Sequence, residues 1–364
     1  MSDNCSSKYR VFVSYSHKDT KLATQVLEHL RRIGVQPMSD QVIPGGTRFS
    51  DSIKWQIACS HAFISILTRK SQRSTWVVSE LGYAIGAGTA VIPLSLGKMP
   101  SGLAHELHAI EVRRNLSDLD DKLTLKDIQN LVKEACKEGR STSQCVDQLL
   151  DRTKLLVDEA ESLQRFPRAG MLRVRQRMAF SSFSIPDEPP CSSVWNVRDG
   201  SVPRSENERG FLRQERRVME QHAVAAGCDL ILDPYVRIGY EDGKETTELK
   251  HSNSMTRVRL EILRNFIRDF PGDDLRVAFN RGQIKGSLIM LGDWLAAEAV
   301  VPHYKSGYRQ TVITRHAPTL LSRIENFEEE LQDSLRADGI VPENSRQAAL
   351  EKIDQIIDEL GDCF

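Results

Sequence analysis

The first third of the chain alternates between short apolar runs and amphipathic stretches. Runs rich in β-branched and aromatic residues predict strands at 9–16, 34–38, 61–68, 88–96 and 108–114. Apolar residues at helical spacing predict helices at 21–34, 49–60 and 74–85. Strands that run apolar throughout and are separated by helices are typical of a parallel sheet covered on both faces. We therefore predict an α/β domain built on a parallel five-stranded sheet.

The rest of the chain shows two further patterns. Apolar stripes without any strand signal predict a helical connector at 117–167. A second α/β or α+β domain is predicted at 168–364, and the polar stretch 240–248 is a loop candidate. The expected helices of this domain are 206–227, 255–268, 317–335 and 345–360, and its expected strands are 228–234, 274–280, two within 286–302, and 307–314.

Composition excludes several function classes. Lys plus Arg number 49 against 50 Asp plus Glu, so no global charge points to nucleic acid or to a membrane. The seven cysteines are scattered, with no CxxC or Cys/His ligand spacing, which argues against a disulfide framework and a zinc site. No apolar run approaches the roughly 18 residues that a membrane span needs. We expect a cytoplasmic protein with no membrane contact and no bound metal.

Polar segments follow the predicted strands where chemistry is expected in such a sheet. The stretch SYSHKD (14–19), the loop 39–47 and the helix start at 74 all come after strand ends. In parallel α/β sheets, ligands bind beyond the carboxyl ends of the strands. Trp76 and Glu80 are four residues apart and share one helix face. Read alone, they could equally be a partly covered indole and an exposed acid on an ordinary amphipathic helix.

Taken in order, VFVSYSHKD, IPGGTRFSDSI, FISILT and STWVVSELGYA make residues 8–116 resemble a TIR domain. The resemblance implies a flavodoxin-like sheet and one of two functions: a protein–protein adaptor, or an enzyme that cleaves NAD+ at the nicotinamide–ribose bond. Enzymatic members carry a glutamate at the position matched by Glu80, which implies a catalytic role, and commonly an aromatic residue at the position matched by Trp76.

The resemblance also implies supporting residues. Phe12 and Ser14, and more weakly Tyr15, match positions that line the substrate pocket. The loop Ile43, Pro44, Gly45 and Gly46 resembles the BB loop, which in enzymatic assemblies closes over a neighbouring protomer's site. Plainer readings stand beside these: Phe12 as core, Ser14 as an ordinary strand-end hydroxyl, and the paired glycines as a turn that needs positive φ.

The chemistry of the reaction suits these residues. Breaking an N-glycosidic bond develops positive charge on the ribose, which a carboxylate stabilises. Nicotinamide leaves as a neutral base, so no general acid is strictly required. A tryptophan face stacks on a cationic pyridinium with about 0.5–2 kcal/mol. NAD+ is then a substrate, and no cofactor is expected.

We therefore expect an NAD+ glycohydrolase, with cyclisation of ADP-ribose as an open second outcome. The two-domain layout resembles bacterial anti-phage, cell-suicide effectors, in which a signal binds the C-terminal domain and the TIR domains form a homo-oligomer or filament. A small anionic nucleotide is the leading activator, and a protein or nucleic-acid partner the alternative. Two rival functions stay open: a non-enzymatic TIR adaptor or scaffold, and a nucleoside deoxyribosyltransferase-like enzyme.

Overall fold

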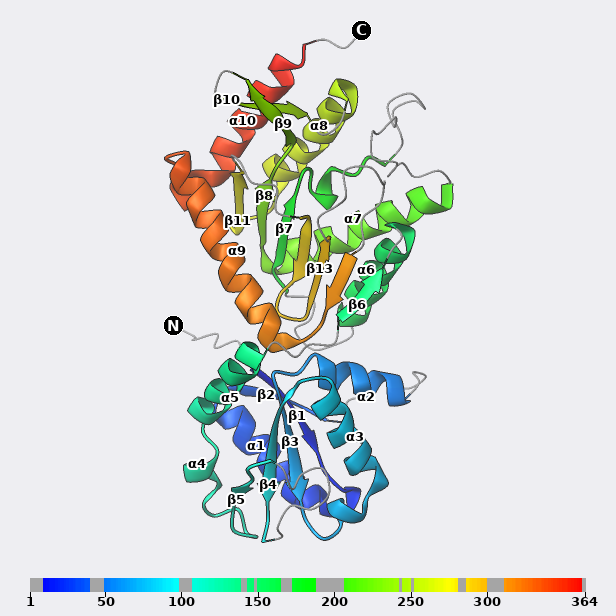
Figure 1. The fold of residues 1–364 in the computed structure, drawn as a ribbon, viewed down its shortest axis with the longest axis vertical. Helices are drawn as coiled ribbons and strands as arrows, with labels where there is room; N and C mark the ends of the chain where they lie inside the picture. Colours follow the sequence, from blue (N-terminus) through cyan, green and yellow to red (C-terminus); the bar gives the residue numbers. More distant parts are fainter. Residues whose placement is uncertain are drawn as a thin grey trace. The chain divides into compact units, whose positions relative to one another are not determined.

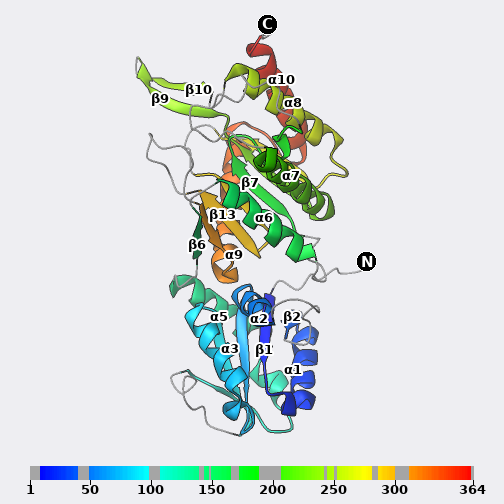
Figure 2. The ribbon, with the colours of Figure 1, turned by 90° about the vertical axis from the view of Figure 1, so that its right-hand side faces the viewer.

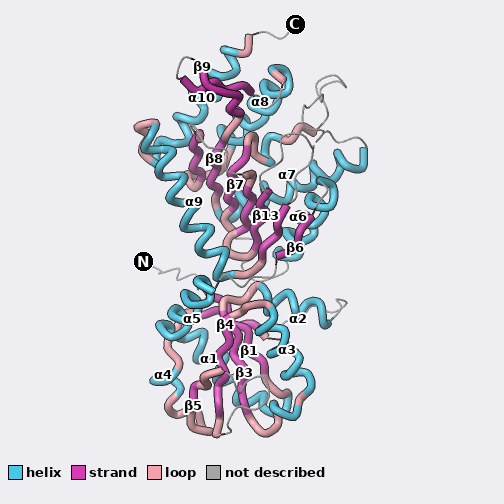
Figure 3. Tube along the Cα trace, viewed as in Figure 1, coloured by secondary structure: helices cyan, strands magenta, loops and turns pink. Residues whose placement is uncertain are grey.

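The computed structural model describes residues 9–39, 49–97, 107–138, 143–146, 149–164, 172–187, 206–241, 244–249, 252–280, 286–299 and 311–361. These fall into two compact units, Met1–Thr142 with Thr314–Ser322, and Ser143–Ile313 with Arg323–Phe364. Each unit has its own central sheet, as the strands of Figure 3 show. Among the described residues, no helix is both long and apolar enough to cross a membrane.

The N-terminal unit is built on a five-stranded sheet in the order β2-β1-β3-β4-β5 (Figure 1). Every strand pair in it is parallel. This confirms the predicted α/β class and its flavodoxin-like strand order. The elements are β1 Tyr9–Ser14, η1 His17–Asp19, α1 Thr20–Arg32, β2 Val35–Met38, α2 Phe49–Ala58, β3 Ala62–Leu67, η3 Ser71–Arg73, α3 Thr75–Gly86, β4 Ala90–Ser95, β5 Ile110–Glu111, α4 Leu119–Lys122 and α5 Leu125–Glu138.

The two faces of this sheet are covered by different helices. Val11 and Val13 of β1 belong to a buried cluster that also contains Val26 of α1 and Ile128 of α5. Side chains alternate along a strand, so Phe12 and Ser14 lie on the opposite face, the side of α3. Figure 2 shows α1 and α3 on opposite sides of the sheet. Each residue of β1 is therefore assigned to one face by its parity.

The C-terminal unit contains a mixed seven-stranded sheet in the order β11-β8-β7-β12-β13-β14-β6, and a separate hairpin of β9 and β10. Strands β11, β8 and β7 are parallel, whereas β12 is antiparallel to both β7 and β13. The elements are β6 Ser143–Val146, α6 Leu149–Gln164, β7 Val174–Met178, η6 Ser182–Ser184, α7 Glu206–Ala226, β8 Cys228–Leu232, β9 Tyr235–Glu241, β10 Lys244–Leu249, α8 Asn253–Asp269, β11 Leu275–Phe279, β12 Leu288–Leu291, β13 Leu295–Ala299, β14 Thr311–Thr314, α9 Ala317–Ala337, η7 Pro342–Asn344 and α10 Ser345–Glu359.

Several expectations for this half need correction. The stretch 117–167 was expected to be a mostly helical connector; it also includes the strand β6, and the boundary between the units falls at 142/143 within it. A four-residue strand with the sequence SQCV carries too little apolar signal to be recognised. The expected loop at 240–248 instead falls largely within the β9–β10 hairpin. Strand β7 was also not predicted, because polar side chains occupy most of its positions.

Candidate functional site in the N-terminal unit

Helix α3 begins immediately after the segment that follows β3, and its first turn is capped. The side chain of Ser74 accepts a hydrogen bond from the backbone N–H of Val77 at 3.5 Å. Such a cap satisfies one of the N–H groups that the first helical turn leaves without a partner. Val77, Leu81 and Ala84 are buried, as the apolar spacing predicted. Their burial fixes the rotation of the helix about its axis.

That rotation places Glu80 against the end of β1. The Glu80 side chain is buried, and the residue is only 6% exposed. Its Oε2 atom accepts a hydrogen bond from the hydroxyl of Ser14, the last residue of β1. A buried carboxylate is costly unless it is hydrogen-bonded, so this contact compensates part of the burial and fixes the orientation of the carboxylate. The structure thus brings together two of the residues singled out from the sequence.

Phe12 lies beneath this pair and is fully buried at 0% exposure. It pairs in register with Phe63 of β3, and the two rings are stacked with centroids 5.7 Å apart and planes 6° apart. A ring enclosed in this way does not face a ligand. The structure therefore gives Phe12 a core position that supports the strand end, instead of the pocket-lining position implied by the resemblance.

Tyr15 follows Ser14 directly and lies on the other side of the sheet. It belongs to the buried cluster with Val13 and the residues of α1 and α5, and is 4% exposed. Its ring makes an edge contact with His17, with centroids 6.3 Å apart. Because successive side chains of an extended segment point to opposite faces, Tyr15 does not share the face of Ser14 and Glu80. It is separated from the candidate site by the sheet.

Trp76 lies one helical turn before Glu80 on α3 and is half-buried. Residues four apart on a helix are neighbours on its surface, so the indole is on the Glu80 side of the helix. An indole that is only partly covered keeps apolar ring surface available for contact. The four residues of the expected BB loop, Ile43, Pro44, Gly45 and Gly46, lie outside the described residues.

Asp19, in the segment after β1, is a buried acid that the sequence analysis did not single out. Its carboxylate is buried, accepts a hydrogen bond from the Thr68 hydroxyl at 2.5 Å, and lies 3.1 Å from Lys70 Nζ. It thereby ties the segment after β1 to the segment after β3, next to the start of α3. The available signal was its place in SYSHKD, directly after a buried strand. Among the described residues, no group of His, Cys, Asp and Glu side chains could hold a metal ion.

Comparison with known families agrees with this geometry. Residues 11–127 match the family model described as the TIR domain. The N-terminal part of this chain is therefore a TIR domain, and the resemblance read from its motifs is confirmed. The match ends before the C-terminal unit begins. Comparison of the whole chain with curated proteins gives no significant match.

Proposed function

We propose that the TIR domain is an NAD+ glycohydrolase in which Glu80 is the catalytic carboxylate. The observation that carries the proposal is the buried Ser14–Glu80 hydrogen bond at the carboxyl end of β1. TIR domains include both NAD-cleaving enzymes and adaptors. A desolvated, oriented carboxylate where such sheets bind ligands supports the enzymatic branch.

In the proposed reaction, the bond between the ribose C1′ and the nicotinamide nitrogen breaks, and its electron pair leaves with the nitrogen. Nicotinamide departs as a neutral base, and water then adds to C1′ and releases a proton. Glu80 stabilises the positive charge that develops on the ribose, because a carboxylate acts more strongly in a partly dry site than in water. Ser14 holds the carboxylate in place, and Trp76 offers a face for the cationic pyridinium ring. Phe12 serves as the support beneath them.

The test is nicotinamide release by the assembled full-length protein. Glu80→Gln keeps the size of the side chain and removes its charge, and Glu80→Ala removes both. We expect each to abolish release while the far-UV circular dichroism spectrum and the unfolding midpoint stay near those of the wild type. Unchanged turnover in both variants would sink the assignment. Product analysis separates hydrolysis, cyclisation of ADP-ribose, and transfer of the sugar to a base.

A second candidate function is a TIR adaptor. The observation that favours it is Val78, which is 44% exposed on α3 and so presents apolar surface on the outer side of the helix. Under this reading, the α3 surface and the BB loop bind another TIR domain. Absence of nicotinamide release under every assembly condition, with binding to other TIR domains retained, would favour the adaptor.

We further propose that the activity is gated in a cytoplasmic anti-phage effector. An unrestrained NADase would exhaust the cofactor of its own cell, and the chain carries a second α/β unit that could hold an off state. A small anionic nucleotide, or alternatively a protein or nucleic acid, would bind this unit and drive TIR assembly into an oligomer or filament. Light scattering alongside nicotinamide release should show particle size and activity rising together on addition of the trigger. Full activity in dilute, monomeric protein would refute the gate.

A further inference from the structure

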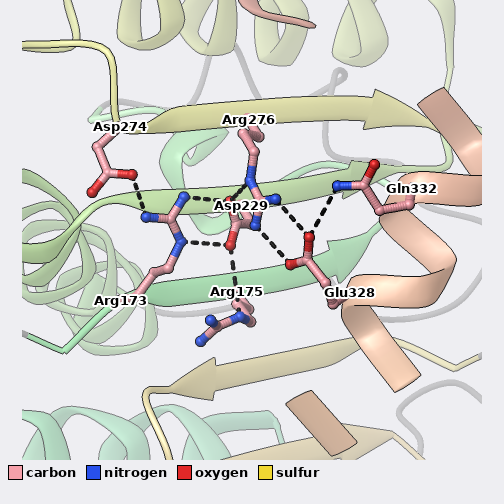
Figure 4. A network of polar contacts seen from close by, with 7 residues as sticks. All are labelled: Arg173, Arg175, Asp229, Asp274, Arg276, Glu328 and Gln332. Carbon is pink, nitrogen blue, oxygen red and sulfur yellow. Dashed lines mark hydrogen bonds and ion pairs between the residues drawn. The ribbon is translucent and has the colours of Figure 1, made fainter. Parts of the chain in front are cut away.

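In the C-terminal unit, three guanidinium groups converge on one fully buried carboxylate (Figure 4). Asp229 lies on β8 with its side chain 0% exposed. It is in register with Arg175 of the neighbouring β7 and with Arg276 of the neighbouring β11. Arg173, just before β7, supplies the third group. The sheet register itself therefore gathers these charges.

Two of the three arginines, Arg173 and Arg276, are hydrogen-bonded to the Asp229 carboxylate. Arg173 donates from Nε and Nη2 to the two oxygens of Asp229, both at 2.6 Å, and Arg276 donates from Nε at 2.8 Å. Each also has a second acid: Arg173 bonds to Asp274, and Arg276 bonds to Glu328 of α9 at 2.6 and 2.7 Å. These bidentate and shared contacts are the geometry that Arg and carboxylate prefer. Arg173 and Arg276 therefore have compensated charges.

Arg175 does not share this arrangement. Its Nε atom lies 3.6 Å from Asp229 Oδ2, beyond hydrogen-bond length, although its side chain is only 14% exposed. Within the described part of the chain, Nε of Arg175 is a buried donor without a hydrogen-bond partner. Its amino nitrogens point away from Asp229 in Figure 4. Burial lowers the pKa of Arg175, with the neighbouring Arg173 and Arg276 adding to the effect and Asp229 and Glu328 opposing it.

The positive charge is concentrated in the dry centre of the cluster. There, three guanidinium groups face the single carboxylate of Asp229. The other two acids are more open to water, because the side chains of Asp274 and Glu328 are 68% and 38% exposed. Solvent screens exposed charges more than buried ones. The centre thus keeps excess positive charge, together with a buried Arg175 Nε donor that lacks a partner among the described residues.

A buried cation without hydrogen bonds is costly, and an anion that accepts from it removes that cost. The edge of a planar guanidinium presents parallel N–H donors that fit two oxygens of a phosphate or a carboxylate. Three positive charges against one buried negative charge favour a doubly charged anion over a singly charged one. We propose that Arg175 is the ligand-binding arginine of a phosphate site in the C-terminal unit, for inorganic phosphate or a small phosphorylated molecule. This phosphate site would bind the anionic activator of the gate proposed above, but the proposal of a phosphate site does not depend on that gate.

The test is thermal unfolding of the full-length protein at constant ionic strength, with sodium chloride replaced stepwise by phosphate. At about 100 times the dissociation constant, a single-site ligand should raise the unfolding temperature of a unit of this size by roughly 5–10 °C. Adenosine monophosphate should act like phosphate, whereas adenosine and acetate should not. These probes distinguish the phosphate group from the nucleoside and from a carboxylate.

Matched variants decide whether Arg175 carries the effect. Arg175→Met should unfold in chloride at the wild-type temperature or above it, and should lose the phosphate shift. Arg175→Lys keeps the charge but not the planar fork, and should keep the fold while binding phosphate at least tenfold more weakly. Arg336→Met, at an exposed position on α9 with 79% side-chain exposure, should keep the full shift.

Three outcomes would overturn the proposal. The first is a wild type without a saturable phosphate shift. The second is an acetate shift as large as that of phosphate. The third is an Arg175→Met variant destabilised in chloride as severely as Arg173→Met, which removes a compensated arginine. None of these measurements uses nicotinamide release, so the phosphate site and the NADase proposal fail or stand separately.

Discussion

Ser14 and Glu80 are 66 residues apart in the chain and are joined by a buried hydrogen bond from the serine hydroxyl to the glutamate carboxylate. One residue ends the central strand β1, and the other lies on the helix that covers the same face. The contact fixes a charged oxygen where the sheet ends. Substitutions can measure what this contact adds to catalysis, and what the buried Asp229 with its arginines Arg173 and Arg276 adds to stability.

Ser14→Ala should lower kcat about 10- to 100-fold, because losing one hydrogen bond to a buried carboxylate costs about 1–3 kcal/mol. The control is Ser65→Ala on β3. Ser65 pairs in register with Ser14 and is fully buried, and its hydroxyl has no hydrogen-bond partner among the described residues. We expect this control to stay within about twofold of wild type. Equal losses in both variants would assign the effect to strand packing.

Trp76→Ala should lose at least about tenfold in kcat/KM for NAD+, because the stacking face is removed. Trp76→Phe should keep part of the activity, since a smaller ring can still stack. Trp55→Ala is a matched control, because Trp55 is also a half-buried indole, on α2. Steady-state kinetics at several NAD+ concentrations measure the effect. If Trp76→Ala behaves like wild type, the indole is merely a helix-surface residue.

Asp229→Asn should destabilise the C-terminal unit by about 3–5 kcal/mol, because it leaves Arg173 and Arg276 without their buried counter-charge. Asp274→Asn removes an acid that is 68% exposed, and should cost less than about 1 kcal/mol. Urea unfolding of the full-length protein, followed by circular dichroism, measures both. Similar midpoints for the two variants would contradict a special role for the buried carboxylate.

Acid should unfold the same unit through Asp229. Burial alone would raise the pKa of this carboxyl, but hydrogen bonds and charge from Arg173 and Arg276 outweigh burial and lower its pKa below the ordinary 3.8. A carboxyl whose pKa is lowered by folding stabilises the protein fully above its ordinary pKa, and this stabilisation is lost as the pH falls through the lower folded value. The urea concentration at the unfolding midpoint of the wild type should therefore decrease as the pH is lowered below about 4. Asp229→Asn should show a shallower fall over the same range.

The sequence by itself determined the N-terminal sheet, because its strands are apolar on both faces and its helices carry continuous apolar stripes. Those patterns are local, so they survive without any knowledge of contacts. The same locality placed Glu80 and Trp76 on one helix face. It also singled out Phe12, Ser14 and Tyr15 together, although contacts with the rest of the fold decide what surrounds each of them. Only the assembled sheet assigned Tyr15 to the far face and enclosed Phe12.

The tertiary structure alone decided the middle of the C-terminal sheet. Strand β7 reads VRQRM and lacks apolar alternation, yet it lies between β8 and β12. Arg173, just before the strand, bonds to Asp229 of β8, and Arg177 within it bonds to Glu330 of α9, across 56 and 153 residues of sequence. A buried charge is acceptable in a strand only when a partner from elsewhere in the chain compensates it. No local pattern contains that partner, so only the fold could reveal the strand.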